Sequence, residues 1–289
     1  MRTRAPLRIS FAGGGSDIEP YSSEYGGCVL AVAIKYYAQA IYPSEPVVPS
    51  EMEQTIIDFY QLPDIVKLTN GAPQQSGLGG SAACFVAAVK AVRPTLHKEE
   101  IASAAFHLER NIMGVAGGRQ DQYVSASGGL RYLIFDGSLV LVEYVPIPEG
   151  LDKTLVLVYM GRRVNAGQDI IKDQMNRMQF SVFHKQKAIA RGMKECLEKQ
   201  DLHAFGVLLD EAWQSKMQYS PMIATDKIKD FYQNCRDWGA IGGKLTGAGG
   251  GGYMLLMEYP EHGKLRKNLS DRGIKYLDVS FDTEGVKVL

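Results

Sequence analysis

The segment Pro73–Lys90, PQQSGLGGSAACFVAAVK, places a glycine-rich turn directly before an apolar, alanine-rich run. The run has the composition of a helix that is buried on every side. Glycine tolerates positive φ and is common at helix ends, so the turn is compatible with simple chain punctuation. A glycine turn before a helix also presents unpaired backbone N–H groups and the positive end of the helix dipole, which together bind phosphate. Both interpretations stay open for this segment alone.

Length and charge limit the classes of partner. The chain has 289 residues, with 32 lysines and arginines against 32 aspartates and glutamates. A chain of this length has room for about two domains. The balanced charge gives no sign of nucleic acid or an anionic membrane as a bulk partner, although it leaves room for a local basic pocket. No apolar run approaches a membrane span, and glycine breaks the N-terminal apolar stretch too early for a signal peptide. The sequence does not determine the oligomeric state.

The four cysteines are widely spaced and form no metal-binding or redox pattern, so we predict reduced thiols in a cytoplasmic protein. The five histidines also lack metal-binding spacing, and we expect them on the surface or on helix faces. These residues are Cys28, Cys84, Cys196, Cys235, His97, His107, His184, His203 and His262.

Apolar patterning predicts an α+β protein with a mixed first half and a helix-rich second half. Asp136-Gly137 lies between two alternating runs and is typical of a hairpin turn. The proline- and glycine-containing stretch PIPEG at 146–150 is the best boundary, which gives predicted domains over 1–150 and 151–289. The predicted strands are Leu7–Ala12, Cys28–Tyr42, Ile65–Thr69, Leu130–Phe135, Leu139–Val145, Thr154–Met160 and Tyr253–Met257, followed by a helix and a strand-rich C-terminus. The predicted helical segments are Ser81–Val92, Lys98–Met113, Gln168–Lys199, Leu202–Met217 and Thr225–Trp238.

Glycine is concentrated in three places, which we call the first (Ala12–Asp17), second (Ser76–Ala83) and third (Thr246–Gly252) glycine clusters. None contains the GxxxxGK pattern of a P-loop. The second and third clusters fit the loose dinucleotide pattern, but both fail on context. The second is not followed by a strand with an acidic end, and the third runs into a strand instead of a helix. The clusters could instead converge on one polyanion.

Two carboxylates near the glycine-rich GVAGGRQDQY are available for metal and proton chemistry. Glu109 lies late in a predicted helix and could equally be a solvated charge, and Asp121 could be a helix N-cap. Phosphoryl transfer needs backbone N–H groups around phosphates, a metal ligand, and a base for the attacking hydroxyl. Spacing alone does not assign these roles.

Three motifs in a fixed order carry a resemblance to a known family. The motifs PLRISFAGGGSD, PQQSGLGGSAA and KLTGAGGGGYMLL resemble those of the GHMP kinases, a family of small-molecule kinases. The resemblance covers most of the chain. It implies a two-domain GHMP kinase fold, with an N-terminal nucleotide-binding domain and a helix-rich, ferredoxin-like C-terminal domain, that uses ATP and Mg²⁺. The pairing of AGGGSDIEPYSSEYGG with AGGRQDQYVSASGG is most similar to members that phosphorylate the anomeric hydroxyl of D-glycero-D-manno-heptose 7-phosphate.

The resemblance also implies roles for individual residues. Asp121 would be the catalytic base or orienting group, and Arg8 would neutralise charge at the transferred phosphoryl. Ser81 and Glu109 would bind Mg²⁺. The implied nucleotide contacts come from Pro73, Ser76, Gly77, Leu78, Gly79, Gly80, Ser81 and Ala82, with Gly247, Gly249 and Gly250 closing the site from the C-terminal domain. The implied contacts to the sugar phosphate come from Gly14, Gly15, Ser16, Asp17 and Arg119.

Some positions depart from the family or stay open. The family often has glycine at Gln75 and serine at Gly80, so a side-chain contact from Gly80 to phosphate is not expected here. The stretches near 43–69 and 93–97 are short for the family, and the adenine pocket is left unassigned. Arg119 could bind the substrate phosphate, orient Asp121 or be solvated, and the pair Arg162 and Arg163 is a second candidate for that phosphate. The alternatives are a galactose- or fucose-type kinase, or a sugar sensor that binds ATP without turnover.

Overall fold

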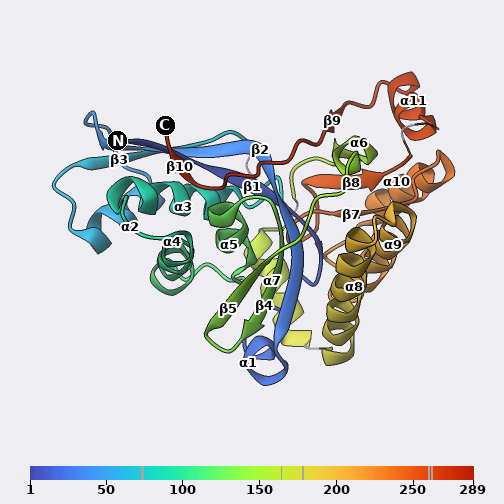
Figure 1. Ribbon diagram of the computed structural model, residues 1–289, viewed down its shortest axis with the longest axis horizontal. Coiled ribbons are helices and arrows are strands. Elements are labelled where there is room, and N and C mark those ends of the chain that lie inside the picture. Colours follow the sequence, from blue (N-terminus) through green and yellow to red (C-terminus); the bar gives the residue numbers. More distant parts are fainter. Residues whose placement is uncertain (73–74, 164, 178, 260, 262) are drawn as a thin grey trace.

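The computed structural model describes residues 1–72, 75–163, 165–177, 179–259, 261 and 263–289. Two antiparallel sheets organise the chain, and helices cover them (Figure 1). The first sheet has six strands in the order β10-β1-β2-β4-β5, with β3 also pairing with β2. Its strands are β1 (Arg2–Ala12), β2 (Gly27–Ser44), β3 (Ile65–Asn70), β4 (Leu130–Asp136), β5 (Leu139–Tyr144) and β10 (Lys287–Val288).

Strand β2 is the centre of the first sheet, because β1 pairs along one of its edges while β4 and β3 share the other. Its first residues pair with β4, from Gly27 opposite Phe135 to Val32 opposite Leu130, and its later residues pair with β3. The residues from Gly27 to Ile34 are all buried, which fits a stretch covered on both faces. The β4–β5 hairpin turns at Gly137, with Asp136 opposite Leu139, so this sequence prediction is confirmed.

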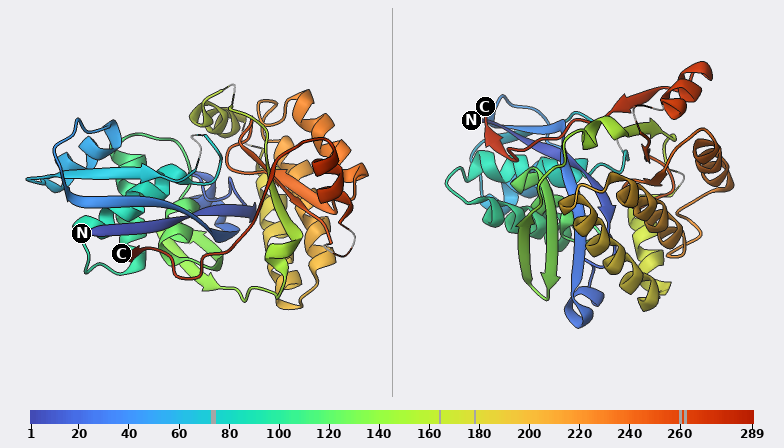
Figure 2. Two further views of the ribbon diagram at one scale, coloured as in Figure 1. Left: turned by 90° about the horizontal axis from the view of Figure 1, so that it is seen from above. Right: turned by 45° about the vertical axis from the view of Figure 1, so that its right-hand side comes forward.

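Helices cover both faces of this sheet. Helix α3 (Gly80–Val92) packs on β1 and β2 together with α5 (Gln120–Ser127), and α4 (Lys98–Phe106) packs on both helices. Nine residues of α3 are buried, which confirms the helix expected from its alanine-rich sequence. Helix α4 continues as a π-helix, η1 (His107–Ile112), and α2 (Glu51–Tyr60) packs against β3. On the other side, α8 (Phe180–Glu198) contacts β1 and β2, and α9 (Leu202–Met217) contacts β1 and the second sheet (Figure 2).

The second sheet has four strands in the order β7-β8-β6-β9, all antiparallel. Along the chain, strand β6 is followed by helices, then by the β7–β8 pair, a helix and β9. This is the β-α-β-β-α-β order of ferredoxin-like domains, so the predicted fold class is confirmed. The elements are α6 (Leu151–Thr154), β6 (Leu155–Tyr159), α7 (Gly167–Arg177), α10 (Asp226–Asp237), β7 (Gly242–Leu245), β8 (Tyr253–Met257), α11 (Lys264–Asp271) and β9 (Tyr276–Asp278).

The C-terminal segment leaves the second sheet and returns to the first. Phe281 bridges to Ile34, and β10 pairs with β1 through Thr3 opposite Val288. Val279 and Val286 belong to the core that also contains β1 and α3. The chain division at residue 150 stays a prediction, and the structure adds that the last strand joins the N-terminal sheet.

Some local predictions differ from the structure. The segment predicted as one helix over Gln168–Lys199 is two helices, α7 and α8, because the backbone at Gln179 leaves the helical region. Helix α2 was not predicted, although Ser50 and Glu53 form a capping box at its start. Helices α1 (Tyr21–Tyr25) and α5 and strand β7 were also missed, since glycine and other turn residues surround them. Every strand pair among the described residues is antiparallel, which confirms that a parallel Rossmann sheet is absent from this part of the chain.

Candidate active site

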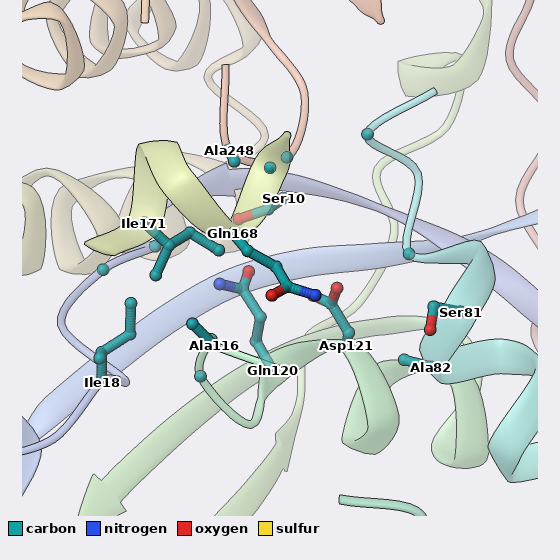
Figure 3. A pocket seen from close by; sticks show the side chains of 18 of the residues that line it. Ser10, Ile18, Ser81, Ala82, Ala116, Gln120, Asp121, Gln168, Ile171 and Ala248 are labelled. Carbon is teal, nitrogen blue, oxygen red and sulfur yellow. The ribbon is translucent and has the colours of Figure 1, made fainter. Parts of the chain in front are cut away.

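A cavity of about 420 Å³ receives residues from all three glycine clusters. Gly14 and Gly15 come from the first cluster, and Gly247 comes from the third. The second cluster supplies the residues from Ser76 to Ala82 except Leu78. The clusters therefore meet at one site, as their shared chemistry suggested. Helix α7 covers the cavity with Gln168 and Ile171, and Asp121 points into it between Ser81 and Gln120 (Figure 3).

The second glycine cluster forms a loop that ends in the N-terminus of α3. Gly77 has φ +80° and Gly79 has φ +75°, a backbone region that residues other than glycine rarely adopt. A Cβ on Gly77 would lie 2.5 Å from the Thr246 carbonyl oxygen, so the second and third clusters touch through their backbones. Gly79 is the N-cap of α3, and the first N–H groups of a helix have no acceptor within it. The loop therefore offers backbone donors and a helix dipole to an anion.

The two departures from the family pattern have structural reasons. Gln75 has φ +61°, a conformation that favours glycine, which explains why glycine is common there in the family. A Cβ on Gly80 would lie 2.2 Å from Asn70 Nδ2. Asn70 thus occupies the space that a serine side chain at position 80 would need. Pro73 lies outside the described residues.

Arg8 joins the loop to Asp121. Its Nε donates to Asp121 Oδ1 at 2.7 Å and its Nη2 donates to Oδ2 at 2.6 Å, a bidentate pair. Its Nη1 donates to the Gly77 carbonyl at 2.7 Å, and its backbone N–H donates to the Leu78 carbonyl at 2.9 Å. Arg8 is only 5% exposed. One side chain therefore fixes both the glycine loop and the carboxylate at the start of α5.

Asp17 is buried and lies close enough to Asp121 for the two charges to interact. It accepts hydrogen bonds from the Gly15 N–H at 3.0 Å and from the Gln120 N–H at 3.2 Å. Burial raises the pKa of Asp17, and the negative charge of Asp121 acts in the same direction against the hydrogen bond from Gln120. A Cβ on Gly118 would lie 1.9 Å from Asp17 Oδ2, so the glycine before Arg119 allows this close approach.

Glu109 and Ser81 lie together at the loop end of the cavity. Glu109 is buried in the π-helix η1, and its Oε2 accepts from Gln122 Nε2 at 2.5 Å. Burial raises the pKa of Glu109, whereas the positive charge of Arg110 and the hydrogen bond of Ser81 lower it. The described residues hold no group of three or more His, Cys, Asp or Glu side chains placed so that they could bind a metal ion. A carboxylate with one hydroxyl fits Mg²⁺, which uses few protein ligands and completes its shell with water and phosphate oxygens.

Several predicted contact residues hold the loops instead of facing the cavity. Ser16 is fully buried, and its hydroxyl donates to the Gly13 carbonyl at 2.7 Å. Leu78 is buried beside β1. Gly249 packs on Ile223, and Gly250 packs on Ile170. These four residues shape the site, and contacts from them to a ligand stay a prediction.

Arg119 points away from the cavity. Its Nη1 donates to the Gly137 carbonyl at 2.6 Å, and its Nη2 lies 3.3 Å from Glu19 Oε1. Its guanidinium also stacks over the Phe106 ring at 5.3 Å. These contacts give Arg119 a structural role at the start of α5 that was not among the three alternatives considered from the sequence, and its contact with the sugar phosphate stays a prediction.

Several cavity residues were missed by sequence reasoning, and three of them are polar groups beside the predicted site. Gln120, Lys216 and Lys244 line the cavity, and both lysines are buried. Lys244 lies two residues before the third glycine cluster. Lys216 lies one helical turn after the buried Trp213, so the available signal for Lys216 was a lysine on an apolar helix face. Gln120 is the neighbour of Asp121 and offered no separate signal.

Comparison with known families agrees with this geometry. The model of the GHMP kinases N terminal domain matches residues 51–129, which include the second glycine cluster, Glu109 and Asp121. The model of the GHMP kinases C terminal domain matches residues 193–271, which include the third cluster. The chain belongs to the GHMP kinase family. Members of this family use ATP as the phosphate donor.

Relatives narrow the class further. The chain is 29% identical to the D-glycero-alpha-D-manno-heptose 7-phosphate kinase of Campylobacter jejuni, over 99% of this chain and 98% of the relative. The crystal structure of a D-glycero-D-manno-heptose 1-phosphate kinase from Bacteriodes thetaiotaomicron superposes with a TM-score of 0.77 at 25% identity and covers 100% of this chain and 99% of that one. A putative sugar kinase from Campylobacter jejuni gives a TM-score of 0.75 at 29% identity, with 99% and 97% covered. This member of the family is a sugar kinase.

Two further findings bear on the sequence predictions. All four cysteines are free, as predicted. Among the described residues, no helix has the length and apolar character needed to cross a membrane.

Proposed function

We propose that this GHMP kinase transfers the γ-phosphoryl group of ATP to the anomeric hydroxyl of D-glycero-D-manno-heptose 7-phosphate. One observation carries the proposal: the bidentate Arg8–Asp121 pair stands between an anion-binding glycine loop and a buried carboxylate, Asp17, suited to sugar hydroxyls. The similarity to heptose phosphate kinases over nearly the whole chain supports the choice of sugar.

Asp121 would accept the hydrogen bond of the attacking hydroxyl and take its proton as the new bond to phosphorus forms. The guanidinium of Arg8 holds this carboxylate in place and occupies one lone pair on each oxygen. A carboxylate has about four acceptor sites, so Asp121 keeps capacity for the sugar. The same guanidinium also carries positive charge toward the transferred phosphoryl group.

Ser81 and Glu109 would hold Mg²⁺ at the start of α3, where the metal neutralises charge on the phosphates. Gln122 orients Glu109 through the 2.5 Å hydrogen bond, so the carboxylate has a fixed direction. This arrangement gives the predicted metal ligands a supporting residue that sequence reasoning did not name.

Asp17 and Gln120 would bind sugar hydroxyls in the part of the cavity away from the predicted metal ligands. Gln120 donates from its amide to Asp17 at 3.3 Å and points into the cavity (Figure 3). Tyr219 closes this end, because its hydroxyl donates to the Gly14 carbonyl at 3.2 Å. Carboxylate, amide and phenol groups together suit a polyol with several hydroxyl donors and acceptors.

The proposal is tested by ADP release with heptose 7-phosphate, heptose, mannose, fucose and galactose in parallel. We expect turnover with heptose 7-phosphate to exceed that with the other sugars, and phosphorus NMR of the product to show a phosphoryl group on the anomeric carbon. Preference for fucose or galactose would replace the proposal with the plain sugar kinase alternative. ATP binding without ADP release on any sugar would favour the sensor. The cytoplasmic location stays a prediction, which fractionation of the native cell would check.

A further inference from the structure

One wall of the cavity carries more positive charge than its neighbours neutralise. Arg8 from β1, Arg163 from the segment after β6, Lys216 from α9 and Lys244 from β7 all line it. Arg8 is paired with Asp121. Within the described part of the chain, the other three have no carboxylate within 4.0 Å. A buried group of cations without anions is a site prepared for a ligand with several negative charges.

Arg163 is the member of this wall whose own donors are unused. Its Nε and Nη2 are buried and have no hydrogen-bond partner among the described residues. A buried guanidinium normally has its N–H groups bonded, because leaving them unpaired is costly. The unused N–H groups of Arg163 therefore need an acceptor that a ligand would supply.

Two glycines make room for Arg163 beside the phosphate loop. A Cβ on Gly247 would lie 2.8 Å from Arg163 Nη2 and 2.7 Å from the Gly77 Cα. A Cβ on Gly167 would lie 2.7 Å from Arg163 Nη1. The guanidinium thus lies where the second and third glycine clusters meet, on the loop side of the cavity. It is close enough to Arg8 and Asp121 for their charges to act on its pKa, which burial lowers.

Lys216 and Lys244 line the same cavity as Arg163 and bring no negative charge that would neutralise it. Lys216 Nζ donates to the carbonyls of Leu245 and Gly247, and Lys244 Nζ donates to the Ser10 carbonyl at 2.9 Å. Carbonyl acceptors hold the ammonium groups in place but leave their charge unbalanced. Burial lowers the pKa of both lysines. An anion beside them would reverse part of this effect.

We propose that Arg163 binds the phosphoryl group that ATP transfers, with Lys216 and Lys244 completing the cationic wall. The inference rests on the proposed kinase function and deepens it. A phosphoryl group could also come from the sugar phosphate, but the guanidinium of Arg163 lies against Gly247, and the position of Gly247 also adjoins Gly77 of the second glycine cluster. Arg8 and Arg163 would then hold the transferred group from the two halves of the chain.

The test measures nucleotide binding in the absence of sugar. Arg163→Ala and the bulk-preserving Arg163→Met are compared with Arg162→Ala, since Arg162 is the exposed neighbour that does not line the cavity. Titration calorimetry in the presence of Mg²⁺ would measure the binding of two ligands, ADP and the β,γ-imido analogue of ATP. We expect both Arg163 variants to bind the analogue about ten- to a hundred-fold more weakly, ADP to change less than about threefold, and Arg162→Ala to change neither.

Equal weakening of the analogue and ADP would overturn the proposal, because contact with the third phosphoryl group must discriminate between them. Unchanged binding of both would overturn it as well. Selective loss of heptose 7-phosphate over heptose would assign Arg163 to the sugar phosphate instead. Added guanidinium should restore part of the turnover of Arg163→Ala. Because nucleotide binding is measured without sugar, this result can be interpreted even if the proposed sugar substrate is wrong.

Discussion

Replacing Gly79 by alanine tests whether the glycine loop is shaped for catalysis or only for turning the chain. At φ +75°, an alanine costs about 1–2 kcal/mol of folding free energy through backbone strain alone. Its Cβ would also lie 3.3 Å from Arg8 Cγ and 3.4 Å from Asp121 Oδ2. Arg8 must therefore shift by a few tenths of an ångström. A misplacement of about 1 Å at a reacting centre can cost about a hundredfold in rate, so for this smaller shift we expect a loss in turnover of up to about tenfold.

Gly150→Ala is the matched control. Gly150 has φ +77°, and a Cβ there meets nothing within 4 Å. Urea unfolding should therefore show a similar loss of about 1–2 kcal/mol for both variants, whereas turnover per folded molecule should fall only for Gly79→Ala. Equal turnover in the two variants would refute the reasoning and leave Gly79 as chain punctuation.

The remaining predictions concern the acid–base group, the metal and a buried lysine. Asp121→Asn should keep ATP affinity within a few-fold and lower turnover by about two to four orders of magnitude; near-normal steady-state turnover would remove Asp121 from the chemistry. Ser81→Ala and Glu109→Gln should each raise the Mg²⁺ concentration for half-maximal rate, and a magnesium titration unchanged in both would leave them structural. Burial lowers the pKa of Lys244 from 10.5 to about 7. The unfolded chain therefore binds an extra proton between these values, so stability should rise with pH across this window, by at most about 5 kcal/mol. Lys244→Met should flatten that rise in urea unfolding, and an unflattened curve would contradict the assignment.

Local features of the fold were predictable because their signals are local. The Asp136-Gly137 hairpin and the buried helix α3 follow from a turn dipeptide and an apolar run, and both are present. The sequence suggested that the three glycine clusters could converge on one polyanion, and residues of all three line one cavity. Helix α2 was missed although its capping residues Ser50 and Glu53 stand in the sequence, since a capping box is easily masked by the surrounding prolines.

What could not be predicted depends on contacts between distant residues. The direction of Arg119 is set by a carbonyl at Gly137 and a carboxylate at Glu19, neither of which shares a motif with it. Lys216 looks like an ordinary helix residue until α9 packs beside the third glycine cluster. Sequence patterns report periodicity and turn chemistry, and they do not report which partner a long side chain finds across the fold.

The pairing of β10 with β1 also affects how the chain folds during synthesis. Thr3 is synthesised long before its partner Val288, because nearly the whole of the described chain lies between them. While the ribosome is still adding residues, β1 has an open edge with unpaired backbone groups. The first sheet therefore cannot be completed before β10 has been synthesised. Deleting Lys287 and Val288 would leave that edge of β1 open and expose it to pairing with other chains.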